Sequence, residues 1–335
     1  MEEQEPPRLG VALLALWRLG RPEAWMVSIL PLATGHLLAS RELLPGLEIW
    51  TTFWHLASTQ GATTAVFRDA LADWWSQADR FVLGAVVFGP LLWIPTLLWN
   101  DVHDLPGDRL NPRKASSPLV QGIVAAGWAN GVAWIGAAAC LTVSWWIDPA
   151  FAALTAACLL LAWLYSAPPA RLKTRPGADV AVNAVGVGLL SALAGWSIAA
   201  PLAGFPWLFA PQGLLVAVAV YVPTTLVDRP SDEAAGYLTL ATHLGERRAY
   251  AIGWSAWVAC NLGALALSWN DQILPRAMFP LLLLFVPLLL WQYHRFIGGA
   301  RDGPARVEGI ILVSLTFAAV NAVFALLYTG LWVPQ

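Results

Sequence analysis

Two short segments of the sequence concentrate aspartates beside long apolar stretches. The first, residues 100–108, reads NDVHDLPGD, and its Asn100, Asp104 and Asp108 recur every four residues. At 3.6 residues per turn, this spacing predicts that the first part of the set lines one face of a helix end. The proline and glycine that precede Asp108 predict that the helix stops there, which leaves Asp108 on a turn.

The second segment, residues 228–233, reads DRPSDE and spaces Asp228 and Asp232 four residues apart. Pro230 suits the first turn of a new helix, with Asp228 near its N-cap. Carboxylates crowded at a membrane repel one another unless a cation neutralises them, and Mg²⁺ is typically held by one or two carboxylates together with substrate phosphates. The two segments therefore predict a Mg²⁺ site for a diphosphate, with the candidate ligands Asn100, Asp101, Asp104, Asp108, Asp228 and Asp232.

Positive charge that complements a diphosphate lies between the two acidic segments. Residues 165–175 read YSAPPARLKTR, in which Arg171 and Lys173 are candidates to hold phosphate oxygens and the final arginine suits a flanking charge. Arg113 and Lys114, just after the first acidic segment, are further candidates. An isolated aspartate usually caps a helix and an isolated cation usually sets topology, but this combination of segments favours a joint site.

The histidines and cysteines do not predict a metal site. His103 and His243 have no second histidine at ligand spacing. Cys140, Cys158 and Cys260 lie inside apolar runs, where we expect them to act as small hydrophobic residues in helix packing.

The rest of the sequence must hold these segments at a membrane surface. Of its 335 residues, 58% are hydrophobic and only 12% are charged, against roughly a quarter in a soluble domain. A span needs about 20 apolar residues, and such stretches recur from end to end. The sequence predicts an all-α, polytopic membrane protein in one domain, 1–335, with nine transmembrane helices near 20–40, 81–100, 122–146, 149–166, 179–200, 209–227, 249–269, 277–297 and 308–332.

The stretch 41–80 is the exception among these spans, because it mixes four tryptophans with charged residues. It predicts one or two amphipathic helices at the membrane interface, inserted between the first and second spans. If the N-terminus is cytoplasmic, 15 of the 19 Lys and Arg residues lie inside and only Arg41, Arg68, Arg80 and Arg276 lie outside. This bias predicts that both acidic segments face the cytoplasm. The acidic N-terminus does not resemble a cleavable signal peptide.

The motifs together resemble the UbiA superfamily of intramembrane prenyltransferases. The first acidic segment matches the family's NDxxDxxxD motif, and the second matches DxxxD followed by Gly236, Thr239, Leu240, Leu244 and Gly245. The segment 165–173 and the pair Arg21-Pro22 also look like the family. The resemblance implies a bundle of two four-helix halves plus one helix, with a central cavity that opens sideways to lipid.

The resemblance also implies an activity and the residues that perform it. A polyprenyl diphosphate would bind through Mg²⁺, ionise to an allylic cation and react with a lipophilic acceptor. The residues expected to act in catalysis are Asp104, Asp108, Asp228 and Asp232, and those expected to bind the diphosphate are Asn100, Arg113, Lys114, Arg171, Lys173 and Arg21. Asn183 and Gly186 look like family positions, while Trp196 and Tyr221 are candidates to stabilise a cation with their rings.

Two features depart from the family. Tyr237 stands where the family often has a lysine, which puts one diphosphate contact in doubt, and the 41–80 insertion is longer than the usual first connection. Small residues such as Gly84, Gly127 and Gly188 permit close helix packing without specifying an oligomeric state.

Three functions remain open from the sequence. The leading one is a prenyltransferase whose acceptor is a quinone precursor, a tetrapyrrole, a glycerol-phosphate lipid or a carotenoid. We expect no nucleic-acid partner. The Ala-, Leu- and Trp-rich composition predicts a bacterial cell membrane as its location. A membrane terpene cyclase of the same superfamily would use the same diphosphate without an acceptor. A cation transporter would need charges near the middle of the membrane, and the nine expected spans contain almost none.

Overall fold

The computed structural model describes residues 9–61, 63–109, 111 and 114–331, and all regular elements in these ranges are helices. Eight helical segments are long and apolar enough to span a membrane: Thr64–Asp108, Ala126–Ile147, Pro149–Ser166, Ala178–Ala199, Phe209–Ala234, Glu246–Trp269, Arg276–Gly298 and Gly303–Tyr328. The predicted all-α polytopic fold is confirmed. The nine expected spans correspond to these eight and to a shorter apolar helix of 15 residues, α2 (Met26–Ser40).

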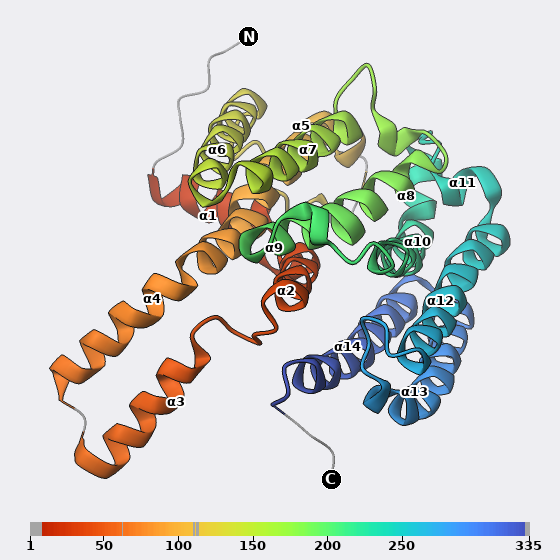
Figure 1. Cartoon of the computed structure of the whole chain (residues 1–335). Helices are drawn as coiled ribbons and strands as arrows, with labels where there is room; N and C mark the ends of the chain where they lie inside the picture. The colour runs from red at the N-terminus through yellow and green to blue at the C-terminus, as the bar shows by residue number, and fades with distance from the viewer. Residues whose placement is uncertain (1–8, 62, 110, 112–113, 332–335) are drawn as a thin grey trace.

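The chain forms a bundle whose helices pack in two groups (Figure 1). The α-helices are α1 (Leu9–Gly20), α2 (Met26–Ser40), α3 (Leu47–Leu56), α4 (Thr64–Val86), α5 (Leu92–Asp108), α6 (Ala126–Ile147), α7 (Pro149–Ser166), α8 (Ala178–Asn183), α9 (Ser191–Ala199), α10 (Phe209–Ala234), α11 (Leu240–Leu244), α12 (Glu246–Trp269), α13 (Phe279–Gln292) and α14 (Gly303–Tyr328). One buried apolar core joins α1, α5, α6 and α7, and a second joins α10, α12, α13 and α14. Helices α2 and α9 contribute to both cores.

Small residues bring the helices that join the two halves into direct backbone contact. A Cβ atom added to Gly35 on α2 would lie 1.9 Å from the carbonyl oxygen of Ala192, and one added to Gly195 on α9 would lie 1.8 Å from that of Leu32. Because apolar side chains gain little from leaving lipid, such close backbone packing is a main source of helix association in membranes. Gly188 makes a similar contact with Gly213, as expected, whereas a Cβ at Gly127 would meet nothing within 4 Å.

The stretch 41–80 forms the α3–α4 hairpin, which extends away from the bundle at the lower left of Figure 1. Aromatic side chains hold its two helices together, with ring centroids 6.0 Å apart for Trp50 and Trp74 and 5.6 Å apart for Phe53 and Phe67. Helix α4 then continues through a π-helical turn, η3 (Val87–Leu91), into α5. The second predicted span is therefore part of a helical segment of 45 residues.

The join between α4 and α5 is kinked. Gly89 has non-helical angles (φ −93°, ψ −112°) and is followed by Pro90, which has no amide hydrogen to donate. The Ser28 hydroxyl on α2 donates to the carbonyl oxygen of Phe88, and the Trp93 indole N–H donates to the same hydroxyl. These contacts satisfy a backbone group at the kink and fix α5 against α2.

Two sequence-based expectations about helix ends were wrong, and one helix was missed. Helix α5 does not stop at Pro106 but runs to Asp108, so that all four residues of the first motif lie on one helix. Helix α10 does not end before Pro230 but runs to Ala234, which places Asp228 in its last turns and not at an N-cap. Helix α1 was not predicted, because an apolar segment of 12 residues is too short to span a membrane.

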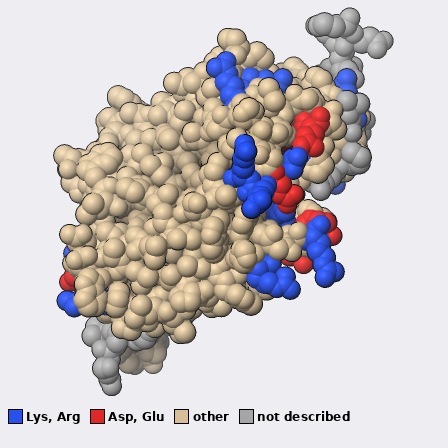
Figure 2. Space-filling view, turned by 90° about the vertical axis from the view of Figure 1, so that its right-hand side faces the viewer, with Lys and Arg blue, Asp and Glu red and all other residues tan. Residues whose placement is uncertain are grey.

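Charged side chains gather at one end of the bundle, and the face that Figure 2 shows is otherwise almost free of them. This polar end is formed by the ends of α5 and α10, by residues 167–175 and by the start of α12. With eight membrane-length helices and an apolar outer face, the chain is an integral membrane protein.

Candidate active site

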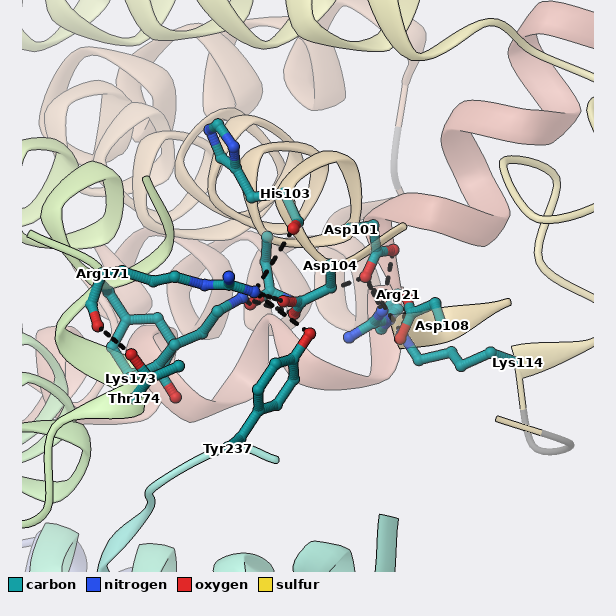
Figure 3. A network of polar contacts seen from close by, with 12 residues as sticks. Arg21, Asp101, His103, Asp104, Asp108, Lys114, Arg171, Lys173, Thr174 and Tyr237 are labelled. Carbon is teal, nitrogen blue, oxygen red and sulfur yellow. Dashed lines mark hydrogen bonds and ion pairs between the residues drawn. The ribbon is translucent and has the colours of Figure 1, made fainter. Parts of the chain in front are cut away.

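The polar end brings segments from several parts of the sequence into one network of hydrogen bonds and ion pairs (Figure 3). Helix α5 supplies the first acidic motif, residues 167–175 supply two cations, and the turn between α10 and α11 supplies Tyr237. Two further cations, Arg21 and Lys114, come from the residues that follow α1 and α5. The network divides into two groups along α5, one around Asp104 and one around Asp101.

The first group surrounds Asp104 with cations. Its carboxylate lies 3.1 Å from Nη2 of Arg171 and 2.5 Å from Nζ of Lys173. Lys173 also donates to Oδ1 of Asn100 at 3.0 Å and is only 7% exposed. Burial lowers the pKa of Lys173, and the negative charge of Asp104 opposes that shift.

The second group is built on Asp101, which is 2% exposed. This carboxylate accepts hydrogen bonds from Nη2 of Arg21 at 2.6 and 2.9 Å and from Nζ of Lys114 at 3.1 Å. Lys114 also lies 3.2 Å from Oδ2 of Asp108. Arg21 and Lys114 line a cavity of about 410 Å³ beside α1, so both cations remain accessible to an anion.

The two arginines of the network share an unusual backbone conformation. Arg21 (φ 41°) and Arg171 (φ 37°) both adopt the left-handed region, which residues other than glycine rarely occupy. Such strain persists only where the surroundings hold it, and it is commonest at functional sites. Here each arginine ends in an ion pair with a motif aspartate.

Tyr237, the residue at which the sequence departs from the motif it resembles, contacts the same network. Its hydroxyl accepts from Nη2 of Arg171 at 3.2 Å, and its ring lies 5.0 Å from that guanidinium carbon. A Cβ atom at Gly107 would lie 2.6 Å from the hydroxyl, so the absence of a side chain on α5 makes room for the tyrosine. Burial and then the charge of Asp104 raise the pKa of Tyr237.

The second acidic motif lies close enough to the first for their charges to interact. Asp232, on the last turns of α10, is acted on by the charges of Asp228 and of Asp104 across the site. Arg113, a predicted diphosphate ligand, lies outside the described residues.

The donor set fits a hard cation that is shared with an anion. Among the described residues, no three His, Cys, Asp or Glu side chains converge closely enough to hold a metal ion by themselves. Carboxylate and amide oxygens are the ligands that Mg²⁺ prefers, and it commonly keeps waters and substrate phosphates in its shell. The arrangement therefore suits an ion whose coordination a diphosphate completes.

Two tyrosines lie deeper in the bundle. The hydroxyls of Tyr165 and Tyr221 are 2.5 Å apart. Tyr221 precedes Asp228 by seven residues on α10, which places it about 10 Å farther along the helix. Trp196, the other ring residue named from the sequence, lies at the opposite end of its span, where its indole N–H donates to the carbonyl oxygen of Pro201 at 2.9 Å.

Asp179 is a residue that the sequence analysis missed. It is 1% exposed; its Oδ1 accepts from the amide of Gly177 and its Oδ2 from the amide of Leu240, both at 2.8 Å. It thus joins the loop that carries Arg171 to the start of α11. Asn183, which looked like a family position, donates to the carbonyl oxygen of Asp179 at 2.9 Å. A lone aspartate just after a Pro-Gly pair was the signal available.

Comparison with known proteins gives one consistent result. A sequence model described as the UbiA prenyltransferase family matches residues 49–315. "Lycopene elongase/hydratase" of Haloferax volcanii is 31% identical over 197 residues, 54% of this chain, and the protein of the same name from Halobacterium salinarum is 32% identical over 229 residues, 65% of this chain. The matches span 60% and 76% of the lengths of those two relatives.

Solved structures show the same fold. A UbiA homolog from Archaeoglobus fulgidus, solved bound to GPP and Mg²⁺, superposes with a TM-score of 0.67 at 21% sequence identity, and the match covers 93% of this chain and 99% of that one.

Proposed function

The chain belongs to the UbiA prenyltransferase family, and on this premise we propose that it transfers a prenyl group from a polyprenyl diphosphate to a lipophilic acceptor within the membrane. The observation that carries the proposal is the convergence of Arg171 and Lys173 on Asp104 at one end of an apolar bundle. Such a site offers cations and metal ligands to a diphosphate, while the bundle offers apolar surroundings to the tail.

The residues of the two groups would divide the work of binding. Arg21, Lys114, Arg171 and Lys173 would contact diphosphate oxygens, and the metal would be held by oxygens from the set Asn100, Asp101, Asp104, Asp108, Asp228 and Asp232. Bound Mg²⁺ would neutralise the diphosphate and so improve it as a leaving group. The burial of Asp101 between two cations supports a further role for it, which is to orient Arg21 and Lys114.

The chemistry would then proceed in the apolar interior. The C–O bond to the diphosphate breaks, the allylic cation forms a C–C bond with the acceptor, and the acceptor loses a proton. Exclusion of water protects the cation during this interval, and aromatic rings stabilise it. The position of Tyr165 and Tyr221, inward from the acidic residues, supports a place for their rings along the tail.

The relatives suggest the acceptor. Two proteins that are 31% and 32% identical to this chain are named lycopene elongase/hydratase, so the acceptor we propose is a linear carotenoid such as lycopene. The excess of Lys and Arg at the polar end supports a cytoplasmic location for the site. A bacterial origin stays a prediction from composition.

The test measures diphosphate release by the detergent-purified chain, supplied with allylic diphosphates of several lengths, with and without Mg²⁺ and lycopene. We expect release to need both, and Asp104→Asn to lower it by about 100-fold or more, because it removes a charge from the centre of the site. Asp73→Asn, at an exposed position on α4, is the matched control and should behave as wild type.

The products separate the remaining possibilities. A prenylated carotenoid supports the proposal. A cyclic hydrocarbon formed without an acceptor would instead identify a terpene cyclase. Absence of release with every diphosphate, with and without lycopene, would refute the proposed transfer to a carotenoid.

A further inference from the structure

The first acidic motif is already paired with the protein's own cations. Nζ of Lys173 lies 2.5 Å from Asp104 and 3.0 Å from Oδ1 of Asn100, so one ammonium group contacts two of the proposed metal-ligand residues. Nη2 of Arg171 contacts the other oxygen of Asp104 at 3.1 Å. Figure 3 shows both side chains reaching across to α5 from the loop that follows α7.

This pairing opposes the binding of a metal ion alone. A divalent cation that takes the oxygens of Asp104 and Asn100 must displace the ammonium of Lys173, since both compete for the same donors. Lys173 is only 7% exposed, and a buried cation that loses its carboxylate is strongly unfavourable. The free energy of metal binding is therefore reduced by the cost of leaving Lys173 unpaired.

A diphosphate removes that cost. Its oxygens give Lys173 and Arg171 a new anion just as the metal takes over the aspartate. Arg171 has other contacts that hold it when it exchanges Asp104 for the diphosphate. Its guanidinium lies over the Tyr237 ring and donates to the Tyr237 hydroxyl and to the carbonyl oxygen of His103. It can therefore release Asp104 and stay at the site.

We propose that Lys173, supported by Arg171, acts as a placeholder for the metal in the substrate-free chain, so that the metal and the diphosphate each bind weakly alone and tightly together. This inference rests on the proposed function, since it takes a metal and a diphosphate as ligands of this site. By linkage, the factor by which diphosphate raises metal affinity equals the factor by which metal raises diphosphate affinity. Coupling of this kind orders the site only when the substrate's head group is present.

Equilibrium dialysis tests the coupling without any catalytic turnover. The full chain in detergent is dialysed against Mn²⁺, which substitutes for Mg²⁺ and is readily counted, with and without inorganic pyrophosphate on both sides. We expect pyrophosphate to raise the Mn²⁺ affinity by about tenfold or more, within the roughly 5–150-fold range of typical couplings. Equal affinity in the two conditions would overturn the placeholder role.

Lys173→Gln gives a sharper test, because its effects should have opposite signs. Without pyrophosphate the variant should bind Mn²⁺ several-fold more tightly than wild type, since no ammonium has to be displaced. With pyrophosphate it should bind Mn²⁺ more weakly than wild type, since one phosphate contact is lost. A residue that merely stabilised the loop would weaken binding in both conditions, and that result would refute the proposal.

Arg175→Gln is the matched control. It removes the same charge two residues away, but Arg175 is exposed and its guanidinium donates to the carbonyl oxygen of Pro169 at 3.4 Å. We expect it to keep the wild-type coupling. If Arg175→Gln also bound Mn²⁺ more tightly without pyrophosphate and more weakly with it, the effect would come from the overall charge of the loop, and the proposal would be overturned. If Lys173→Gln does not fold, the wild-type comparison still decides.

The outcomes also separate this inference from the proposed function. Tight Mn²⁺ binding that ignores pyrophosphate contradicts the placeholder role and leaves prenyl transfer standing. No Mn²⁺ binding even with pyrophosphate would contradict both.

Discussion

At the scale of single residues, the site depends on how closely Tyr237 approaches α5. The tyrosine hydroxyl occupies the space in which any side chain at Gly107 would begin. The two positions are therefore expected to depend on each other, although they are 130 residues apart in the sequence.

Gly107→Ala should disturb the site only while the tyrosine hydroxyl is present. The new Cβ would lie 2.6 Å from that oxygen but 3.4 Å from the nearest ring carbon, so removing the hydroxyl relieves the clash. We expect Gly107→Ala to raise the KM for the prenyl diphosphate by about tenfold, as overpacking costs roughly 1–3 kcal/mol. In the Tyr237→Phe background the same change should have little effect, and additive effects in this double-mutant cycle would contradict the contact.

The sequence predicted most of the residues that meet at the site but not their partners. Spacing identified Asp104, Arg171 and Lys173, because motif and charge are visible in the sequence. The ion pair of Asp101 with Arg21 depends on the path of the chain between α1 and α5, which spacing does not encode. Tyr237 contacts the same network through its hydroxyl, and whether it replaces the diphosphate contact of a lysine stays a prediction.

At the scale of secondary-structure elements, Asp179 connects two segments that must stay in register. Its carboxylate accepts from the amides of Gly177 and Leu240, which precede α8 and begin α11 respectively. Asp179→Ala should destabilise this connection by about 1–3 kcal/mol, because it leaves a buried amide without a partner. Hydrogen exchange at Leu240 should accelerate. Asp302→Ala, which removes an exposed cap from α14, should leave that amide protected.

The glycine contacts between α2 and α9 give a prediction for helix packing. Gly35→Ala should lower the free energy of unfolding of the purified protein by about 1–3 kcal/mol, because the new methyl group would overlap the Ala192 carbonyl. A thermal unfolding experiment measures this loss. Gly131→Ala on α6, where a Cβ meets nothing within 4 Å, should be neutral or slightly stabilising. Equal losses of stability in both variants would show that the close contact of α2 with α9 at Gly35 does not account for the effect.

The spans themselves were predictable and their ends were not. Apolar length located all nine expected spans, eight of which are long enough to cross a bilayer, since each such element must cover the hydrocarbon. Proline misled at the ends of α5 and α10, because Pro106 and Pro230 are exposed and both helices continue past them, to Asp108 and to Ala234. The whole first motif therefore lies on one helix.

At the scale of the whole molecule, the asymmetry of charge predicts how the chain lies in its membrane. The three native cysteines are buried, so a single introduced cysteine can report on exposure. Arg175→Cys should react with a membrane-impermeant maleimide only in inverted vesicles, and Glu42→Cys only in right-side-out vesicles. The opposite pattern would reverse the orientation we propose and place the site outside.

The kink between α4 and α5 has a practical consequence for the molecule. Ser28 and Trp93 hold the start of α5 at the kink, and the α3–α4 hairpin precedes the kink and lies away from the acidic end (Figure 1). A rigid helical protein fused between α3 and α4, with the helical register kept, would extend outside the detergent micelle. It would serve as a fiducial domain for aligning images of this small protein in electron cryomicroscopy and would leave the proposed diphosphate-binding residues in place.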